Sequence, residues 1–336
     1  MSTTVNFLEK VGLTWFVPVV RLAAGEDPRA QFRALGMLVG IPMLAMLLFL
    51  AVWNITASGL ETSLGTIPGP AEVWTEFEGL VDSHIAEREK AAEFYERQEK
   101  RNAEKLARDP DAEVTIRAWT GKPTYFDQIL TSLNTVFTGF LLATIVAVPL
   151  GILCGSSPVV MAALNPLIQI FKPVSPLAWL PIVTLIVSAV YATADDGIPK
   201  SFIVSAVTVT LCSLWPTLIN TALGVASVDR DLMNVAKVLR LSWFKKVTTI
   251  IVPSSLSLIF TGLRLSLGVG WMVLIAAEML AQNPGLGKFV WDEFQNGSSS
   301  SLGRIMVAVL TIGIIGFLLD RVMLTLQQMF TYGERR

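Results

Sequence analysis

The stretch Asn234-Val-Ala-Lys-Val-Leu-Arg-Leu-Ser-Trp-Phe-Lys-Lys-Val-Thr-Thr-Ile-Ile-Val-Pro253 separates two long apolar runs. It is polar and basic, its residues favour a helix, and the next apolar run begins at its closing proline. A membrane protein rarely needs such a loop for its own fold. We therefore expect the loop to offer a helix on the cytoplasmic side to another protein.

The composition is that of a polytopic membrane protein, with 52% hydrophobic residues, 16% charged residues and a mean hydropathy of +0.57. The net charge of −1 gives no support for nucleic-acid binding. Cys154 and Cys212 both lie in apolar runs, which favours small buried side chains over a disulfide or a metal site. His84 has no His or Cys nearby, so we expect a solvated histidine and no metal site.

The N-terminal segment, residues 1–34, does not resemble a secretory signal. A charged amphipathic stretch comes before the first apolar run, and no small-residue cleavage site follows an early apolar core. Apolar residues in this stretch lie close to basic ones, which favours a cytoplasmic helix in the membrane interface. The alternative is a simple extension of the first span. In either case the first apolar run remains as a membrane span.

The apolar runs indicate the membrane spans, since a helix needs about 20 apolar residues to cross about 30 Å of hydrocarbon. The long uncharged run between Gln128 and Phe171 is interrupted at 155–158, which predicts a broken helix at 159–171. The chain is therefore expected to be all-α, with six transmembrane helices. The spans are placed at about 35–54, 129–153, 173–194, 201–228, 252–280 and 305–319.

The orientation follows from basic residues in the short flanks, which face the cytoplasm. Such residues gather in the N-terminal flank, in the loop after the fourth span and in the tail at 329–336. An even number of spans puts all three on one side. We expect both termini to be cytoplasmic, in a bacterial inner membrane.

The segment 55–126 is then a periplasmic polar insertion. Residues 82–122 are about one-third charged, and acid-to-base pairs four residues apart, such as Glu93 with Arg97, predict an exposed helix at about 83–108. The sequence leaves two roles open for this insertion: a solvated spacer arm, or a docking surface for a binding protein.

From about Tyr125 to Gln328 the chain resembles the permease subunits of the nitrate/sulfonate/bicarbonate branch of ABC importers, and nitrate and bicarbonate permeases above all. Eight groups of residues carry the resemblance: 171–182 (Phe-Lys-Pro-Val-Ser-Pro-Leu-Ala-Trp-Leu-Pro-Ile), 215–221, 261–264, 270–271, 276–280, 285–287, 290–292 and 318–321. The resemblance implies a type I ABC importer permease fold (MetI-like). The core domain would span 127–328, with five transmembrane helices.

In that family the loop quoted first, 229–252, would be the coupling loop, whose helix near 231–242 docks on a separate ATPase. The general coupling motif has Glu-Ala-Ala and then Gly, whereas this chain has Asn234, Val235, Ala236 and Arg240, as nitrate-type permeases do. The residues expected to contact the ATPase are Leu232, Asn234, Val235, Ala236, Leu239, Arg240 and Ser242. Of these, Leu232, Val235, Ala236 and Leu239 would form the apolar knob.

The chain lacks a Walker A motif: Gly287-Lys288 is followed by Phe289, and Gln282 stands where the first glycine should be. We therefore expect no catalytic residues and no bound cofactor, with ATP and Mg²⁺ held by partner ATPase subunits. The other implied partners are a periplasmic or lipid-anchored substrate-binding protein, a second permease copy in a homodimer, and membrane lipid.

Two ionisable residues fall inside the span predicted at 252–280. Arg264 lies about 16 Å along the helix from Pro253, near mid-membrane, where it either attracts an anion or makes a fixed ion pair. Trp179 and Ser175 are the other candidates for the translocation path. Glu278 lies nearer the outer surface and is expected to be structural or to contact the binding protein, as is Trp291.

The predicted function is a permease of an ATP-driven importer for a small anion, with nitrate the first choice. Bicarbonate, cyanate or a sulfonate such as taurine remain alternatives. A stand-alone channel or secondary transporter would call for inverted repeats and more intramembrane charges. A membrane-embedded enzyme would need a catalytic constellation within the spans.

Overall fold

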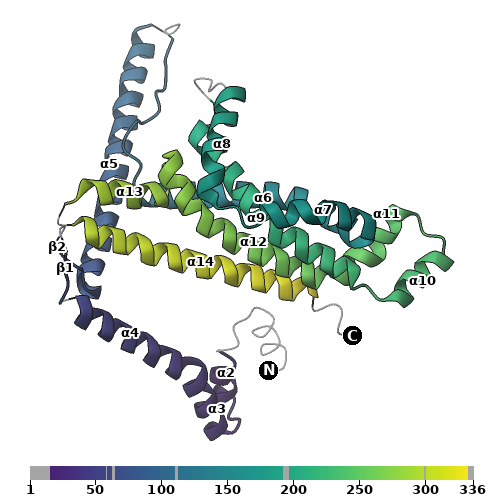
Figure 1. The fold of residues 1–336 in the computed structure, drawn as a ribbon. Coiled ribbons are helices and arrows are strands. Elements are labelled where there is room, and N and C mark those ends of the chain that lie inside the picture. Colours follow the sequence, from purple (N-terminus) through teal and green to yellow (C-terminus); the bar gives the residue numbers. More distant parts are fainter. Residues whose placement is uncertain are drawn as a thin grey trace.

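A computed structural model describes residues 16–331 apart from 58, 63–64, 110–112, 192–196 and 299, and the described chain is almost entirely helical (Figure 1). The N-terminal part contains α2 (Val17–Ala23), α3 (Pro28–Leu35), a π-helical turn (Gly36–Gly40), α4 (Ile41–Ala57), β1 (Glu61–Thr62), β2 (Gly65–Thr66) and α5 (Pro70–Arg108). The rest contains α6 (Tyr125–Ser156), α7 (Pro158–Phe171), α8 (Pro176–Val190), α9 (Lys200–Ala226), α10 (Arg230–Val238), α11 (Trp243–Lys246), a π-helical turn (Val247–Ile251), α12 (Val252–Ala281), α13 (Leu286–Asn296) and α14 (Ser301–Thr331).

Five helical runs among the described residues are long and apolar enough to cross a membrane: Pro28–Ala57, Tyr125–Ser156, Lys200–Ala226, Trp243–Ala281 and Ser301–Thr331. A sixth span is obtained when α7 and α8 are counted together. The predicted span at 173–194 differs from this arrangement, because α8 has only 15 residues and meets α7 at a bend of 101°. Pro173 and Pro176 flank that bend, and neither proline can donate a backbone hydrogen bond to the preceding turn.

The N-terminal segment contains two short helices where it is described. Gly25, between α2 and α3, has a φ of 77°, which glycine adopts readily, and the chain turns there. The first span then runs on from α3 through the π-helical turn into α4. The described part of this segment is therefore two short helices, of which α3 continues into the first span, while an interfacial position for α2 stays a prediction. Residues 1–15 lie outside the described part.

The centre of the bundle is α9, which packs along α6 on one side and α12 on the other. Glycine makes the approach of α6 to α9 possible. A Cβ at Gly139 would lie 2.7 Å from the carbonyl oxygen of Ala206, and one at Gly155 would lie 2.4 Å from that of Ala222. Small residues at such crossings are the usual device of membrane helices, where apolar burial gives no advantage over lipid.

A cluster of buried hydroxyl groups joins α9 to α12. The Ser266 hydroxyl of α12 donates to the Ser213 carbonyl oxygen of α9. The Thr217 hydroxyl, which is also on α9, donates to the Ser266 hydroxyl at 2.7 Å. All three residues are fully buried. Because hydrocarbon offers no competing partners, such hydrogen bonds fix how neighbouring helices are turned.

The insertion forms a longer helix than predicted, since α5 begins at Pro70 rather than near residue 83. Pro70 occupies the first turn, and Glu72 accepts a hydrogen bond of 3.0 Å from the Gly69 backbone N–H, which caps the start. Val73 and Leu80 are buried in the main hydrophobic core. The acid–base pairing revealed only the exposed half of the helix, because tertiary packing supports the first half.

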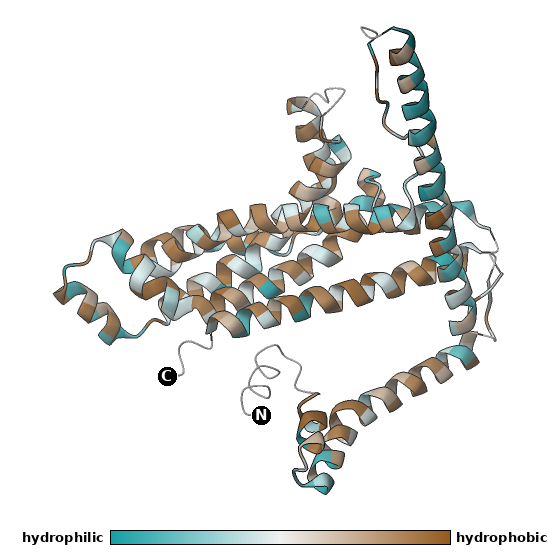
Figure 2. Cartoon of the chain, turned by 180° about the vertical axis from the view of Figure 1, so that it is seen from behind, coloured by the Kyte–Doolittle hydropathy of each residue, from teal (hydrophilic) through white to brown (hydrophobic). Residues whose placement is uncertain are grey.

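The two ends of the bundle differ in character (Figure 1). At one end α10 and α11 project as a loop. At the other end lie α13, the β1–β2 hairpin and the base of α5. Figure 2 shows that the bundle is largely hydrophobic, whereas the distal half of α5 is hydrophilic. The fold thus has the projecting α10–α11 loop at one end and the hydrophilic arm of α5 at the other.

Candidate functional site

The loop between α9 and α12 is built around α10, which has defined caps at both ends. The Asp229 side chain accepts a hydrogen bond of 2.9 Å from the Asp231 backbone N–H at the start of the helix. At the other end, the Leu241 N–H donates to the Ala236 carbonyl and the Arg240 N–H to the Lys237 carbonyl, both at 3.0 Å. This is a Schellman motif, and its left-handed residue is Arg240, with a φ of 50°.

Four apolar side chains form an exposed ridge along α10 and its C-terminus. They are Leu232, Val235, Val238 and Leu239, and Val238 is 82% exposed. Ala236 was predicted to belong to this knob but is only 2% exposed, so it packs against its own chain and offers nothing to a partner. Val238, which the sequence analysis missed, takes its place: it lies on the same side of the helix as Val235 and Leu239 at helical spacing.

The ridge continues on α11. Ser242 accepts a hydrogen bond of 3.4 Å from the Lys245 N–H and begins this short helix, which presents Trp243 and Phe244 to the outside. Neither aromatic residue was predicted as a contact. Their place beside Lys245 and Lys246, in a loop outside the apolar runs, was the available signal. An apolar ridge with basic flanks is the kind of surface that another protein covers.

Arg264 makes a two-pronged ion pair with Asp320 of α14. Its Nε donates to Oδ1 at 2.5 Å and one terminal nitrogen donates to Oδ2 at 2.8 Å. Both side chains are about one-third exposed. The fixed ion pair, one of the two roles left open for Arg264, is thus the one the structure contains. The guanidinium remains partly accessible beside its partner.

The Arg264–Asp320 pair borders a cavity of about 860 Å³ between α12 and α14. Leu265 and Met272 provide apolar walls, while Gln327 donates to the Thr261 hydroxyl at 3.1 Å. The Gln328 and Thr331 side chains also line it, and each has a buried oxygen without a hydrogen-bond partner among the described residues. The cavity is therefore amphipathic, with its polar groups near the end of α14.

The bend between α7 and α8 holds the other two predicted path residues. The Ser175 hydroxyl accepts a hydrogen bond of 3.3 Å from the Leu177 N–H and so caps α8. The Trp179 ring lies 5.7 Å from Phe171, which in turn stacks on Trp215 at 6.4 Å. Both indole N–H groups are buried, and neither has an acceptor in the described chain. Two buried indole donors without an acceptor, Trp179 of α8 and Trp215 of α9, thus lie near the bend.

Glu278 is fully buried where α6, α12 and α13 meet. It accepts hydrogen bonds from the Ser132 hydroxyl at 2.8 Å and from the Gly287 backbone N–H at 2.9 Å. The same Ser132 hydroxyl accepts from the Leu286 N–H at 2.8 Å. Of the two roles left open for Glu278, the structure contains the structural one, since the buried carboxylate fixes the start of α13 to α6 and α12 and is not exposed to a binding protein.

Trp291 and Phe294 lie on α13 with their ring centres 6.0 Å apart, and Phe294 is exposed. Trp291 is half-buried and remains a candidate contact residue at this end of the bundle. His84 is not the solvated histidine that was expected. Its ring lies 2.7 Å from the Thr124 hydroxyl and packs beside Phe126. No group of His, Cys, Asp and Glu that could hold a metal ion occurs within the described ranges.

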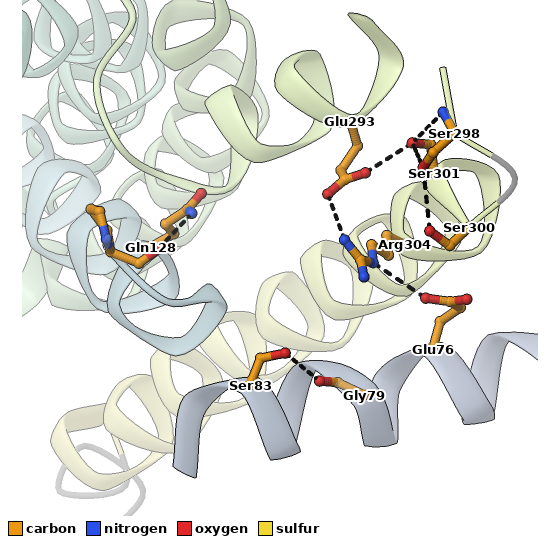
Figure 3. A network of polar contacts seen from close by, with 10 residues as sticks. Glu76, Gly79, Ser83, Gln128, Glu293, Ser298, Ser300, Ser301 and Arg304 are labelled. Atoms are coloured by element: carbon orange, nitrogen blue, oxygen red, sulfur yellow. Dashed lines mark hydrogen bonds and ion pairs between the residues drawn. The ribbon is translucent and has the colours of Figure 1, made fainter. Parts of the chain in front are cut away.

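A polar network links α5, α13 and α14 (Figure 3). Arg304 of α14 donates to Glu76 of α5 at 3.2 Å and to Glu293 of α13 at 3.3 Å. Ser301 donates to the second oxygen of Glu293 at 3.0 Å. The base of α5 is therefore tied to both helices that form this end of the bundle.

Comparison with known protein families shows which family the chain belongs to. Residues 147–331 match the model of the "binding-protein-dependent transport system inner membrane component". This match covers more than half of the chain. The chain belongs to this family of ABC importer permeases. It is thus a multi-pass membrane protein, and the family implies ATPase and substrate-binding partners.

Nitrate and bicarbonate permeases resemble the chain over most of their own length. The nitrate import permease protein NrtB of Synechocystis is 37% identical over 209 residues, which is 62% of this chain and 71% of that relative. The bicarbonate transport system permease protein CmpB of the same organism is 40% identical over 210 residues, 62% and 70% of the two chains. CmpB of Synechococcus elongatus is 33% identical over 289 residues, 86% and 88%.

Proposed function

We propose that this permease forms the membrane path of an ATP-driven importer for a small anion, with nitrate as its first substrate. The exposed ridge on α10 and α11 is the observation that carries the mechanism. Four apolar side chains and two aromatic ones project at the end of the bundle opposite α13. A separate ATPase subunit that covers this ridge would remove them from water.

The mechanism follows from how α10 is connected. Capped at both ends, α10 can move as a rigid unit, and the chain continues from it through α11 and the π-helical turn into α12. ATP and Mg²⁺ would be held by the ATPase, and closure of two ATPase subunits would draw two coupling helices together. The α12 helices would follow, so that the path opens toward the other side. The permease itself performs no hydrolysis.

A complete path requires two permease copies, for which we propose a homodimer with both termini cytoplasmic. The amphipathic cavity at Arg264 and the bend at Trp179 are the polar features that a permeating anion could meet. Arg264 already has a carboxylate partner, so it would attract an anion only weakly. The indole N–H groups of Trp179 and Trp215 have no acceptor in the described chain and carry no charge, but they are buried, so an oxyanion would reach them only if the bend rearranged during transport.

Bicarbonate is the second candidate substrate. Its support is the similarity to CmpB, which at 40% identity is as close as the similarity to NrtB. Nitrate and bicarbonate are both small, planar, singly charged oxyanions, so the same path suits either. Cyanate and taurine-like sulfonates remain further alternatives.

Substrate choice is tested by transport into proteoliposomes that contain the permease, its ATPase and its binding protein. Labelled nitrate uptake that depends on ATP, and that excess bicarbonate, cyanate or taurine does not reduce, is the expected result. Uptake of labelled bicarbonate without nitrate uptake would replace the substrate and keep the importer. ATP-independent flux of any of these anions would contradict the importer itself.

A further inference from the structure

The arm formed by α5 and the returning segment 113–124 is not a loose spacer. Its base is anchored by packing and by ion pairs: Glu76 binds Arg304, Arg88 binds Asp127, and the ring of Phe77 packs on Phe126. Since α5 has 39 residues, it is about 60 Å long, and its second half extends beyond the bundle (Figure 1). A helix of this length is not needed for the chain to turn back from α5 to the start of α6.

The distal half of the arm is held together by contacts of its own. The Gln98 side chain is 5% exposed and exchanges two hydrogen bonds with the backbone of Arg117, at 3.0 and 2.7 Å. The Trp119 backbone N–H donates to the Tyr95 hydroxyl at 3.0 Å. The ring centres of Trp119 and Phe94 lie 5.1 Å apart. These contacts hold the returning segment against the helix and make the arm a defined surface.

That surface carries an apolar hollow of about 380 Å³. Tyr95 and Leu106 of α5 and Val114 and Ile116 of the returning segment line it, and all four remain exposed. Ile116 is 77% exposed, although the distal half of α5 beside the returning segment is hydrophilic and extends away from the apolar bundle (Figure 2). Clustered apolar side chains on a polar, water-facing arm mark a contact with another protein.

A predominantly basic hollow of about 520 Å³ adjoins the apolar one, and Glu104 and Glu113 are its only acidic lining residues among those described. Arg101, Arg108 and Arg117 line it and make no ion pair within the described parts of the chain. The partner that fits both hollows presents an apolar side chain with carboxylates beside it. Anionic lipid fits less well, because acidic and basic residues alternate along the helix from Glu87 to Arg108.

Resting on the proposed function, we propose that this arm is a docking site for the importer's soluble substrate-binding protein. A stable dimer interface buries about 2,000 Å² or more and is largely apolar, which is much more than this small patch can supply. An aromatic and aliphatic centre with a charged rim suits a partner that must bind and leave. The Arg304 network gives the arm a rigid link to α13 and α14 (Figure 3).

The test is the affinity of a fluorescently labelled binding protein for the permease in nanodiscs, with and without the ATPase. Ile116→Asp should weaken binding roughly tenfold, as expected for a residue near the centre of a contact. The matched control is Lys100→Gln on the opposite side of α5. It changes the net charge equally and should leave the affinity unchanged. Arg101→Gln with Arg117→Gln should weaken binding and reduce its dependence on salt.

Unchanged affinity in both Ile116→Asp and the double variant Val114→Asp/Ile116→Asp would overturn the proposal. So would a loss of the dimer in Ile116→Asp, measured by mass, because the arm would then bind a second copy. Weaker binding of the detergent-purified variant to phosphatidylglycerol vesicles, with the binding-protein affinity unchanged, would assign the arm to lipid instead. Binding of the binding protein to the permease without the ATPase tests the arm alone. Failure of the wild-type permease to bind its ATPase would contradict only the proposed function.

Discussion

Arg264 and Asp320, 56 residues apart in the sequence, join α12 to α14 through two hydrogen bonds between their charged groups. Either charge would be costly without the other among these apolar helices. Each is held as an ion because the other is present, and the planar guanidinium matches the two carboxylate oxygens. The pair thus fixes how these two helices lie and gives the adjoining cavity its polar edge.

The first prediction concerns this pair. Arg264→Gln and Asp320→Asn should each lower the free energy of unfolding by on the order of 1–2 kcal/mol, since each leaves one charge unpaired in a partly accessible site. The double variant should lose less than the sum of the two. Thermal unfolding in one detergent measures all three. Strictly additive losses would show that the two side chains do not stabilise each other.

The second prediction concerns the contact between α12 and α13 at Gly287. A Cβ there would lie 2.2 Å from the Ile275 carbonyl oxygen and 2.9 Å from Cβ of Glu278. Gly287→Ala should therefore cost about 1–3 kcal/mol of stability, because both backbones would have to shift.

Gly268→Ala on α12 is the matched control, since a Cβ there meets nothing within 4 Å. It should be neutral or stabilise the helix by up to about 1 kcal/mol, because alanine favours a helix. Melting temperatures measured in the same detergent compare the two variants. An equal change in both would rule out the close packing of α13 as the cause.

The third prediction concerns Arg240, which ends α10 in a conformation that usually belongs to glycine. Arg240→Gly should preserve or raise the melting temperature, because it removes about 1 kcal/mol of backbone strain. It should nevertheless weaken ATPase binding, since the Arg240 side chain is exposed and makes no ion pair in the described chain. Unimpaired ATPase binding with raised stability would show that the guanidinium has no role in the contact.

Much of the fold could be predicted from the sequence because apolar run length is a direct measure of a membrane span. The family resemblance and the six-span, all-α fold are confirmed. The bend between α7 and α8 was less predictable: proline indicates that a helix is interrupted, but the angle depends on packing. The start of α5 at Pro70 was missed because Val73 and Leu80 are buried against distant helices.

The candidate site was predicted unevenly for similar reasons. Helical spacing identified Val235 and Leu239, yet it could not tell that Ala236 faces inward, since the loop's own packing decides that. An intramembrane arginine called for a partner, but the sequence did not indicate Asp320. Glu278 was predicted near an outer surface from its distance along the helix. Its burial depends on α13 folding back over it.

The most direct test of the account is the affinity of the ATPase subunit for the permease in nanodiscs, with Val235→Asp compared with Lys237→Gln. The two residues lie on different sides of α10, and both changes lower the net charge by one. The account predicts that Val235→Asp weakens ATPase binding at least tenfold, because it puts a charge in the middle of the apolar ridge, while Lys237→Gln binds nearly as the wild type does. Equal affinity in the two variants would contradict the claim that this ridge couples the permease to its ATPase.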